Sequence, residues 1–482
     1  MINQLISSAE NKIKLAENKN LLDVSAIRRH FLFPERGRIV TNNAASTQPP
    51  KELLNLYTDL SKDYENVHRG QSNASRYITN LFEESYNIIT KFINAPDRRN
   101  IVITRNTTEA INTVMYSLLT QFRDGDNIVT TFMEHNSNYV PWYGLCKEIL
   151  PKFGIKVECR LARFQPQTGE LDLTHLKSLV DSRTKIICCI GASNFLGTKI
   201  HLHLVKEIAD YSGYLQPNGE CRSLLLVDGA QLIPGTFTDF HTLNVDYLCF
   251  SFHKMLAPFG IGVLCAKQHL LETSLPFLYG GDMIAEGDVS PDYVGYNSLP
   301  WKYAAGTPNI LGTIISAQAL RLLLDLALNP DEQKYFLTTN EFNIQTVEGA
   351  MNRISSHIKM LTEKAMYILS RIKGITIYGP KNVNRRTGLI SFNVAGCNPF
   401  EIAEELNKAG VESRAGCHCA TLAHKYLKLD PPASCRLSFY FYNTIDEAEF
   451  AAETVNKIVN SKNRIDISLN TNENTLNNGL TK

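Results

Sequence analysis

Seven short apolar runs between residues 100 and 266 constrain this chain more than any other feature. They alternate with stretches of helical pattern, and each is almost continuously apolar, as expected of strands buried on both faces. This alternation predicts an α/β domain built on a mainly parallel, seven-stranded sheet. Ligands of such sheets collect at the carboxyl ends of the strands. The predicted strands are Asn100–Thr104, Asn127–Thr131, Lys156–Arg160, Lys185–Ile190, Leu224–Val227, Tyr247–Ser251 and Gly262–Ala266.

The remaining sequence predicts a second, smaller domain. The chain has 482 residues, which favours two or three domains at roughly 150 residues each. β-like runs at Ile375–Tyr378, Gly388–Val394 and Arg436–Phe441, with a helix near Pro399–Ala409, predict a small α+β domain. We therefore expect an N-terminal helical segment (1–37) that packs with the small domain, a large domain (38–315), the small C-terminal domain (316–462) and a disordered, Asn-rich tail (463–482).

Charge and hydropathy exclude several classes of protein. With 49 Lys and Arg against 48 Asp and Glu, the chain lacks the basic excess that nucleic-acid proteins use to neutralise phosphates. No apolar run approaches the ~20 residues of a membrane span, and the N-terminus lacks the apolar core of a signal peptide. We expect a cytoplasmic enzyme without nucleic-acid or membrane partners. The cysteines at 188, 189, 249 and 265 lie in apolar runs, which predicts small buried side chains in a reducing compartment.

A lysine and an aspartate follow two of the predicted strands. Lys254 ends the segment Ser251-Phe252-His253-Lys254, directly after an apolar run. An amine in a partly desolvated pocket becomes a nucleophile for carbonyls, so Lys254 is a Schiff-base candidate, although most single lysines are surface residues. Asp228 ends the run Leu224–Val227. A carboxylate there needs a cationic partner, such as a protonated pyridine nitrogen, unless it only caps a helix.

Two further strand ends supply polar groups. Thr107 and Thr108 open a helical stretch, where hydroxyls and backbone N–H groups bind phosphate, although ordinary capping uses the same residues. His135 follows another strand and could stack on an aromatic ring or be purely structural. Together, the four segments provide a carbonyl-reactive amine, an anion for a pyridinium, a phosphate cradle and a stacking ring. Those are the groups that pyridoxal 5'-phosphate (PLP) requires.

With these segments in order, the chain resembles the class V aminotransferase family of fold-type I PLP enzymes, and within it the cysteine desulfurase and selenocysteine lyase branch. The likeness runs from about residue 38 to 455. The segments that carry it are NNAASTQPP (42–50), YENVHRG (64–70), TRNTTEAIN (104–112), EHNSNYVPW (134–142), SNFLGT (193–198), VDGAQ (227–231), SFHK (251–254), YGGDMI (279–284), AGTPN (305–309), RAGCHCA (414–420) and SCRLSFYFYNT (434–444).

The resemblance implies a role for each matching position. Lys254 forms the Schiff base, Asp228 pairs with the pyridine nitrogen, and His135 stacks on the ring. Gln231 binds the ring hydroxyl, and Arg436 with Asn194 grips the carboxylate of a small amino-acid substrate. The phosphate is held by Thr107, Thr108, Ser251 and His253. Thr307 is expected to reach the phosphate of a neighbouring subunit, which implies a homodimer.

Cys419 stands where the branch has its persulfide-forming cysteine. The resemblance therefore implies a PLP-dependent desulfurase that converts L-cysteine to L-alanine and passes sulfur through a Cys419 persulfide to an acceptor protein. A cysteine thiol at its usual pKa of about 8.5 is mostly protonated at neutral pH, and His418 and Arg414 could lower that pKa. His418 could equally be a solvent-facing loop residue.

The chain departs from the family pattern at three places. Cys417 precedes the His-Cys pair and could resolve a persulfide or be inert; no second cysteine pair accompanies it, so no metal site is expected. Asn106 and Phe252 replace smaller residues and could narrow the pocket. Two alternatives remain open: another class V enzyme, such as an aminotransferase, epimerase or C–S or C–Se lyase, in which Cys419 is not catalytic, or a sulfur-relay protein with a degenerate site.

Overall fold

A computed structural model describes residues 22–330 and 341–477. Its centre is a seven-stranded sheet in the order β2-β8-β7-β6-β5-β3-β4. All strand pairs are parallel except those that β8 makes with β2 and β7. The strands are β2 (Ile101–Thr104), β3 (Asn127–Thr131), β4 (Glu158–Ala162), β5 (Thr184–Ile190), β6 (Leu224–Asp228), β7 (Tyr247–Ser251) and β8 (Gly262–Ala266). The predicted mainly parallel sheet is confirmed, and β4 starts two residues late because its ladder with β3 begins at Glu158.

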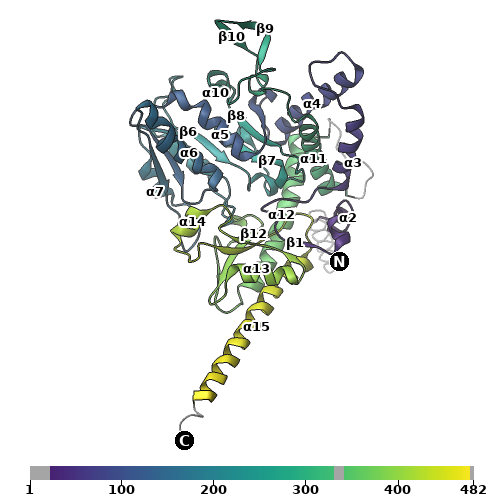
Figure 1. The fold of residues 1–482 in the computed structure, drawn as a ribbon, viewed down its shortest axis with the longest axis vertical. Coiled ribbons are helices and arrows are strands. Elements are labelled where there is room, and N and C mark those ends of the chain that lie inside the picture. The colour runs from purple at the N-terminus through teal and green to yellow at the C-terminus, as the bar shows by residue number, and fades with distance from the viewer. Residues whose placement is uncertain (1–21, 331–340, 478–482) are drawn as a thin grey trace, which may run out of the picture.

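Helices cover both faces of this sheet (Figure 1). Within β6, Leu225 and Val227 face one core cluster, while Leu224 and Leu226 face the other. The first cluster packs against α4 and α11, and the second against α5 and α6. The helices of the large domain and its N-terminal approach are α2 (Val24–Arg28), α3 (Lys51–Leu60), α4 (Asn73–Phe92), α5 (Thr107–Ser117), α6 (Val140–Gly144), α7 (Leu173–Leu179), α8 (Leu202–Asp210), α9 (Phe240–Leu243), α10 (Gln268–Thr273) and α11 (Ile310–Leu328).

The cysteines of the apolar runs are buried, as predicted. Cys188, Cys189, Cys249 and Cys265 are each 0% exposed within β5, β7 and β8. All eleven cysteines of the chain lie in its described part and are free thiols. The four cysteines of the sheet act in the core as small apolar side chains.

The helix α11 corrects one expectation drawn from hydropathy. By length and composition, this helix (Ile310–Leu328) could cross a membrane, whereas the sequence analysis expected no apolar segment of that length. In this fold 83% of the apolar stretch of α11 is buried. The helix packs against α3, α4 and α12. Its apolar surface is therefore used by the protein core.

The smaller domain is built on an antiparallel sheet in the order β11-β12-β15-β14. Its strands are β11 (Ile375–Ile377), β12 (Leu389–Val394), β14 (Arg414–Gly416) and β15 (Ser434–Ser438), and its helices are α12 (Ile344–Leu369), α13 (Pro399–Lys408), α14 (Thr421–Tyr426) and α15 (Ile445–Asn477). The predicted strand Arg436–Phe441 starts earlier and ends at Ser438, because Tyr440 leaves the sheet and donates its hydroxyl to the Pro234 carbonyl at 3.0 Å.

The N-terminal segment contacts this domain. Strand β1 (Ile39–Val40) pairs in parallel with β13 (Val411–Glu412). Arg28, in α2, forms an ion pair with Glu447 at 2.8 Å. Residues 1–21, part of the segment predicted to be helical, lie outside the described residues. At the other end, α15 continues to Asn477, within the stretch predicted to be disordered, and 478–482 lie outside the described residues.

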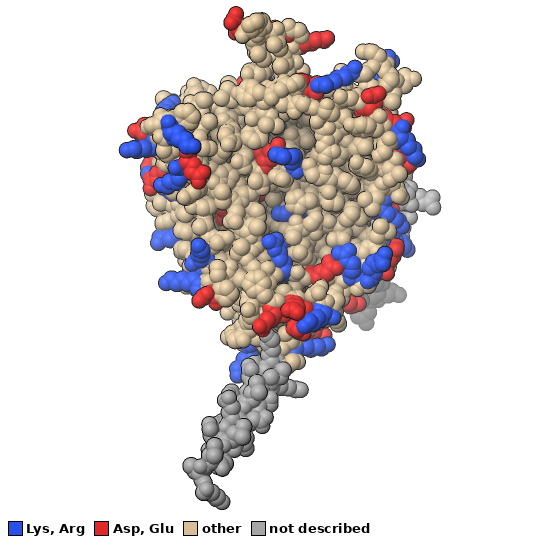
Figure 2. Space-filling view, in the orientation of Figure 1, with Lys and Arg blue, Asp and Glu red and all other residues tan. Residues whose placement is uncertain are grey.

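The surface carries both signs of charge. On the face shown in Figure 2, basic and acidic side chains are interspersed over a mostly uncharged surface. Above the body of the molecule stands a hairpin of β9 (Ile284–Ser290) and β10 (Tyr293–Tyr296), which the sequence analysis missed (Figure 1). Several of its apolar side chains are exposed, among them Val289 at 58% and Tyr293 at 60%.

One glycine sets the approach of α5 to the sheet. A Cβ at Gly262, on β8, would lie 2.5 Å from the Asn106 Cα, which no real structure tolerates. Asn106 is the N-cap of α5, so this glycine allows the first turn of α5 to reach the strand ends.

We predict that Gly262→Ala destabilises the protein by about 1–3 kcal/mol, because the added methyl group meets backbone that cannot rotate away. The matched control is Gly349→Ala, on an exposed position of α12 with nothing within 4 Å of a new Cβ. That change should stabilise the helix by about 0.5–1 kcal/mol. Thermal unfolding of both variants tests the prediction, which fails if the two changes have the same sign.

Candidate active site

Ten of the twelve predicted site residues line one cavity of about 240 Å³ at the carboxyl ends of the strands. They are Thr107, Thr108, His135, Asn194, Asp228, Gln231, Ser251, His253, Lys254 and Arg436. The large domain supplies the floor, and the small domain closes one side through Arg414, His418 and Arg436. The two predicted residues that do not line it are Cys419 and Thr307.

Lys254 lies in a single helical turn that follows β7. The side chain is partly buried, and burial lowers its pKa from 10.5 to about 8, with Asp228 opposing the shift. Among the described residues no hydrogen-bond or ion-pair partner holds its Nζ. This amine therefore loses its proton and becomes nucleophilic at a lower pH than an exposed lysine does.

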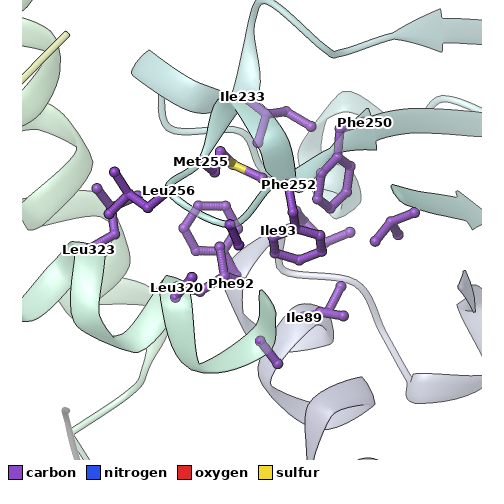
Figure 3. Packing of buried hydrophobic residues seen from close by; sticks show 14 of the residues in the cluster. Ile89, Phe92, Ile93, Ile233, Phe250, Phe252, Met255, Leu256, Leu320 and Leu323 are labelled. Carbon is purple, nitrogen blue, oxygen red and sulfur yellow. The ribbon is translucent and has the colours of Figure 1, made fainter. Parts of the chain in front are cut away.

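Apolar packing around Phe252 and Met255 holds the turn that carries Lys254 (Figure 3). Phe252 is 0% exposed, with its ring centroid 5.8 Å from that of Phe250. Its side chain points into the core among Ile93, Met255 and neighbouring residues. The expectation that Phe252 narrows the pocket is wrong, because its backbone places the ring on the side opposite to the cavity.

Asp228 ends β6 with its side chain almost wholly buried, at 2% exposure. Its Oδ1 accepts a hydrogen bond of 3.0 Å from the Ala230 N–H. Burial raises the pKa of this carboxyl, and the bond from Ala230 and the charge of Lys254 oppose the rise. Within the described part of the chain Asp228 forms no ion pair. A buried carboxylate in this state calls for a cationic partner in the cavity.

The first turn of α5 forms the end of the cavity that suits a phosphate. The Asn106 side chain accepts a hydrogen bond from the Glu109 N–H, and the Thr107 N–H donates to the Ser251 Oγ at 2.7 Å. The Thr108 N–H has no partner among the described residues. A free N–H at the positive end of an eleven-residue helix, beside three hydroxyls, is a ready anion site. Asn106 also lines the cavity, and its capping bond fixes its side chain.

His135 is a neutral ring in this site. Its Nδ1 accepts from the Ser137 N–H at 3.1 Å and from the Ser137 hydroxyl at 2.6 Å. Burial, with the nearby charge of Lys254, lowers the pKa of His135 to about 4. The Nε2 of the neutral ring therefore carries the proton, and the ring faces the cavity as a flat uncharged surface.

Arg436 lies at the opposite end of the cavity. The guanidinium is 1% exposed, and its Nη1 donates to the Asn194 carbonyl at 2.8 Å. Neither its Nε nor the Oδ1 of Asn194 has a hydrogen-bond partner among the described residues. Burial lowers the pKa of Arg436 to about 9, and no carboxylate of the described residues pairs with it. An unpaired buried guanidinium is suited to bind a substrate carboxylate.

Cys419 lies on a short loop between β14 and α14, just outside this cavity. The loop is tied to the turn of His135, because the Asn136 N–H donates to the Cys419 carbonyl at 2.7 Å. His418 and Cys419 adopt left-handed φ angles of 52° and 56°, a tight turn that holds the thiol half-buried. A Cys419 thiolate would raise the pKa values of Lys254 and Arg436, which places its sulfur within electrostatic reach of both.

His418 takes neither of the roles expected of it. It is 1% exposed, and its Nε2 donates to the Ser434 carbonyl at 3.0 Å. Burial and the charge of Arg436 lower the pKa of His418 to about 2. Because the ring stays neutral, it cannot act as a cation that promotes the Cys419 thiolate, and it is not solvent-facing.

A family comparison decides what this arrangement is. The family model for aminotransferase class-V matches residues 39–341 and 342–450. This chain belongs to the class-V aminotransferase family. Its fold is accordingly that of the fold-type I PLP enzymes, and the protein depends on PLP as its cofactor.

Several relatives of this class-V chain carry a more specific name. The probable cysteine desulfurase of Halobacterium salinarum is 33% identical over 452 residues, which cover 92% of this chain and 98% of the relative. The cysteine desulfurase of Haloferax volcanii is 34% identical over 454 residues, or 90% and 96% of the two chains.

Solved structures of similar proteins show the same likeness. The cysteine desulfurase of Thermococcus onnurineus superposes with a TM-score of 0.78 at 28% identity, covering 91% of this chain and 98% of that one. The cysteine desulfurase CsdA of Escherichia coli, in an S-sulfonic acid form, gives a TM-score of 0.75 at 27% identity with the same coverage.

The residues of the class-V cavity fit PLP in charge and shape. Within the described residues, Asp228 is a buried carboxyl without an ion-pair partner, as a protonated pyridine nitrogen requires, and Lys254 is an amine without a hydrogen-bond or ion-pair partner, as an aldehyde requires. The free N–H of Thr108 lies at the helix end that suits a phosphate. Gln231, whose Nε2 donates to the Ala44 carbonyl at 2.6 Å, lines the wall between these groups.

Thr307 lies away from this cavity in its own chain. Its hydroxyl accepts from the Asn66 Nδ2 at 3.5 Å, and it lines a different hollow with Arg105 and Glu109. The predicted contact of Thr307 with the phosphate of a neighbouring subunit stays a prediction.

The sequence analysis missed one residue that organises the site. Glu134 is buried beside His135 and accepts hydrogen bonds from the Thr131 hydroxyl at 2.6 Å, the Asn138 amide at 2.7 Å and the Ile190 N–H at 3.0 Å. These bonds join the ends of β3 and β5. Burial raises the pKa of Glu134 to about 8. In the sequence, only the position of Glu134 at the start of the segment EHNSNYVPW could have indicated that it belongs to the site.

We predict a pH-dependent effect of Lys254→Met on the stability of the cofactor-free protein. The pKa of Lys254 falls from 10.5 to about 8 on folding, so the folded state binds this proton less tightly than the unfolded state does. The resulting destabilisation is complete below the folded pKa of about 8 and fades as the pH rises to 10.5. The variant should therefore gain stability over the wild type at neutral pH, and this gain should shrink at alkaline pH. Thermal unfolding across that range tests it; a difference independent of pH contradicts it.

Proposed function

We propose that this chain is a PLP-dependent cysteine desulfurase, which converts L-cysteine to L-alanine and takes the sulfur onto Cys419. One observation carries the proposal. The unpaired groups Lys254, Asp228 and Arg436 line one cavity, and the half-buried thiol of Cys419 lies within electrostatic reach of two of them. The names of the relatives agree with it.

Each residue of the cavity has a separate role that follows from its position. Arg436 binds the substrate carboxylate, since its guanidinium is buried and no described residue supplies a counterion. Lys254, with its pKa lowered to about 8, takes the proton from the substrate Cα. Asp228 keeps the far end of the cavity anionic. When bound, PLP supplies the electron sink that makes this Cα–H bond acidic.

The sulfur transfer balances without an external oxidant. The Cys419 sulfur attacks the sulfur of the substrate, so a Cys419–S–S bond forms and the substrate Cβ–S bond breaks. The electron pair of that bond remains with the carbon skeleton, which takes up protons and leaves as alanine. The enzyme is left with a persulfide that a sulfur acceptor consumes. We propose a protein acceptor, because the loop with Cys419 is short and held at both ends by β14 and α14.

Two features support a homodimer. Thr307 is remote from the cavity of its own chain, and the hairpin β9–β10 stands clear of the body with exposed Val289 and Tyr293 (Figure 1). Exposed apolar groups of this kind mark contact surfaces. We propose that the second subunit covers them and receives Thr307 at its cofactor phosphate. A cytoplasmic location stays a prediction.

A second candidate is another class-V reaction, such as transamination, epimerisation or C–S or C–Se lysis, in which Cys419 takes no part. One observation favours it: Cys419 is absent from the residues that line the cavity itself. The role of the thiol distinguishes the two candidates.

We predict that Cys419→Ala lowers alanine formation from L-cysteine by about two orders of magnitude, because the variant lacks the thiol that interacts electrostatically with Lys254 and Arg436. The control is Cys417→Ala, two positions away and also half-buried, which should keep most of the activity. Alanine release and persulfide labelling by mass spectrometry are the measurements. Full activity of Cys419→Ala, with the cofactor bound through Lys254, favours the second candidate.

We predict that Thr307→Val weakens PLP binding by about 10–100-fold, as the loss of a hydrogen bond to a charged group would. Mixed dimers of Thr307→Val with Lys254→Ala chains should regain one tight site, since only one of their two sites then has both native residues. Cofactor titration of the mixture measures this. Equal weakness of the mixed and single variants would show that Thr307 does not act across subunits.

A further inference from the structure

A second cavity lies behind the active site, between the two domains. Its volume is about 120 Å³, and it shares Ala44, Gln231 and Lys254 with the active-site cavity. Its other walls come from Lys199 of the large domain and from α12, the 383–389 loop and residues 438–440 of the small domain. We call it the interdomain chamber.

The interdomain chamber is positively charged. Its lining includes Lys199, Lys254, Lys359 and Arg386, and no Asp or Glu among the described residues. Hydroxyl groups that can donate hydrogen bonds accompany them, among them that of Ser355. The chamber thus offers donors and positive charge with no anion of the chain to balance them.

Lys199 is a partly buried cation whose charge no nearby group balances within the described residues. Its side chain is partly buried, and its Nζ has no hydrogen bond or ion pair within the described part of the chain. Burial lowers the pKa of Lys199, and no neighbouring charge contributes to that shift. A buried ammonium without a counterion is unfavourable, because the ion has lost part of its hydration and no opposite charge replaces it.

Arg386 forms the fixed wall of the chamber. The residue is 3% exposed, and its Nη atoms donate to the carbonyls of Pro380 and Leu389 at 2.8 Å each. In the part of the chain that the structure describes, no group accepts a hydrogen bond from its Nε. These bonds use only neutral backbone oxygens, so the positive charge of Arg386 is unbalanced as well.

We propose that the interdomain chamber binds a small oxyanion, such as inorganic phosphate or sulfate, with Lys199 as its main charge partner. A single anion balances Lys199 and Arg386 together and accepts from the nearby donors. The chamber is smaller than the roughly 300–1,000 Å³ of pockets for larger ligands, which excludes a nucleotide. The chamber adjoins the active-site cavity, but its proposed charge partners, Lys199 and Arg386, take no part in the desulfurase chemistry, so the proposal stands whether or not Cys419 is catalytic.

Calorimetric titration of the PLP-loaded enzyme with inorganic phosphate, at an ionic strength held constant with chloride, tests the site. Bound PLP keeps the titrant out of the cofactor phosphate cradle. The wild type should show saturable binding, and Lys199→Gln should bind at least about tenfold more weakly, equivalent to 1.4 kcal/mol. The control Lys152→Gln, at an exposed lysine that is not part of the chamber lining, should bind as the wild type does.

Each other outcome overturns the proposal. These are no saturable binding of either phosphate or sulfate by the wild type, equal affinity of the wild type and Lys199→Gln, or an equal loss in Lys152→Gln. Should Lys199→Gln fail to fold, Lys359→Gln replaces it, since that side chain is exposed and lines the chamber. It should bind phosphate several-fold more weakly, and unchanged affinity would again exclude the site. A parallel titration with sulfate identifies which oxyanion is preferred.

Discussion

The structure depends on holding charges without ion-pair partners in a largely buried cavity at the edge of a sheet. Asp228 and Lys254 lie at the ends of adjacent parallel strands, β6 and β7, and neither makes an ion pair within the described residues. Leaving such charges unpaired is unfavourable, so the apolar sheet and its helices must stabilise the arrangement. The ends of the strands suit such charges, because side chains there point out of the apolar core while their backbone stays fixed by the hydrogen bonds of the sheet. The cofactor then completes a site that the protein has already ordered.

The small domain is as necessary to the site as the sheet. Arg436 lies on β15, and its Nη1 reaches the Asn194 carbonyl of the large domain at 2.8 Å. Asn43 binds the Ser438 carbonyl at 2.8 Å, and Ser391 donates to the Phe195 carbonyl at 2.7 Å. These bonds hold the two domains in register across the active site. The interdomain chamber is a consequence of the same junction, because its cations come from both sides.

The sequence predicted much of this arrangement because the relevant signals are local. Continuous apolar runs gave all seven strands of the large sheet, and the polar residue after each run gave Lys254, Asp228, His135 and the Thr107 turn. Lys199 and Arg386 gave no comparable signal. They are ordinary cations in sequence, and only the packing of the domains makes them a pair. The direction of Phe252 and the neutrality of His418 were missed for the same reason, since both depend on which atoms surround the side chain.

By itself, the sequence determined the family, the sheet and the kinds of group that meet at its edge. Alternation of apolar runs with helices predicts a mainly parallel sheet, and in such a sheet the carboxyl ends of the parallel strands meet at one edge. Only the tertiary structure decided the electrostatic state of those groups. A pKa depends on burial and on charges brought from distant segments, as when burial, together with the charge of Arg436, keeps His418 neutral. The position of Cys419, held by a bond from Asn136, was decided in the same way.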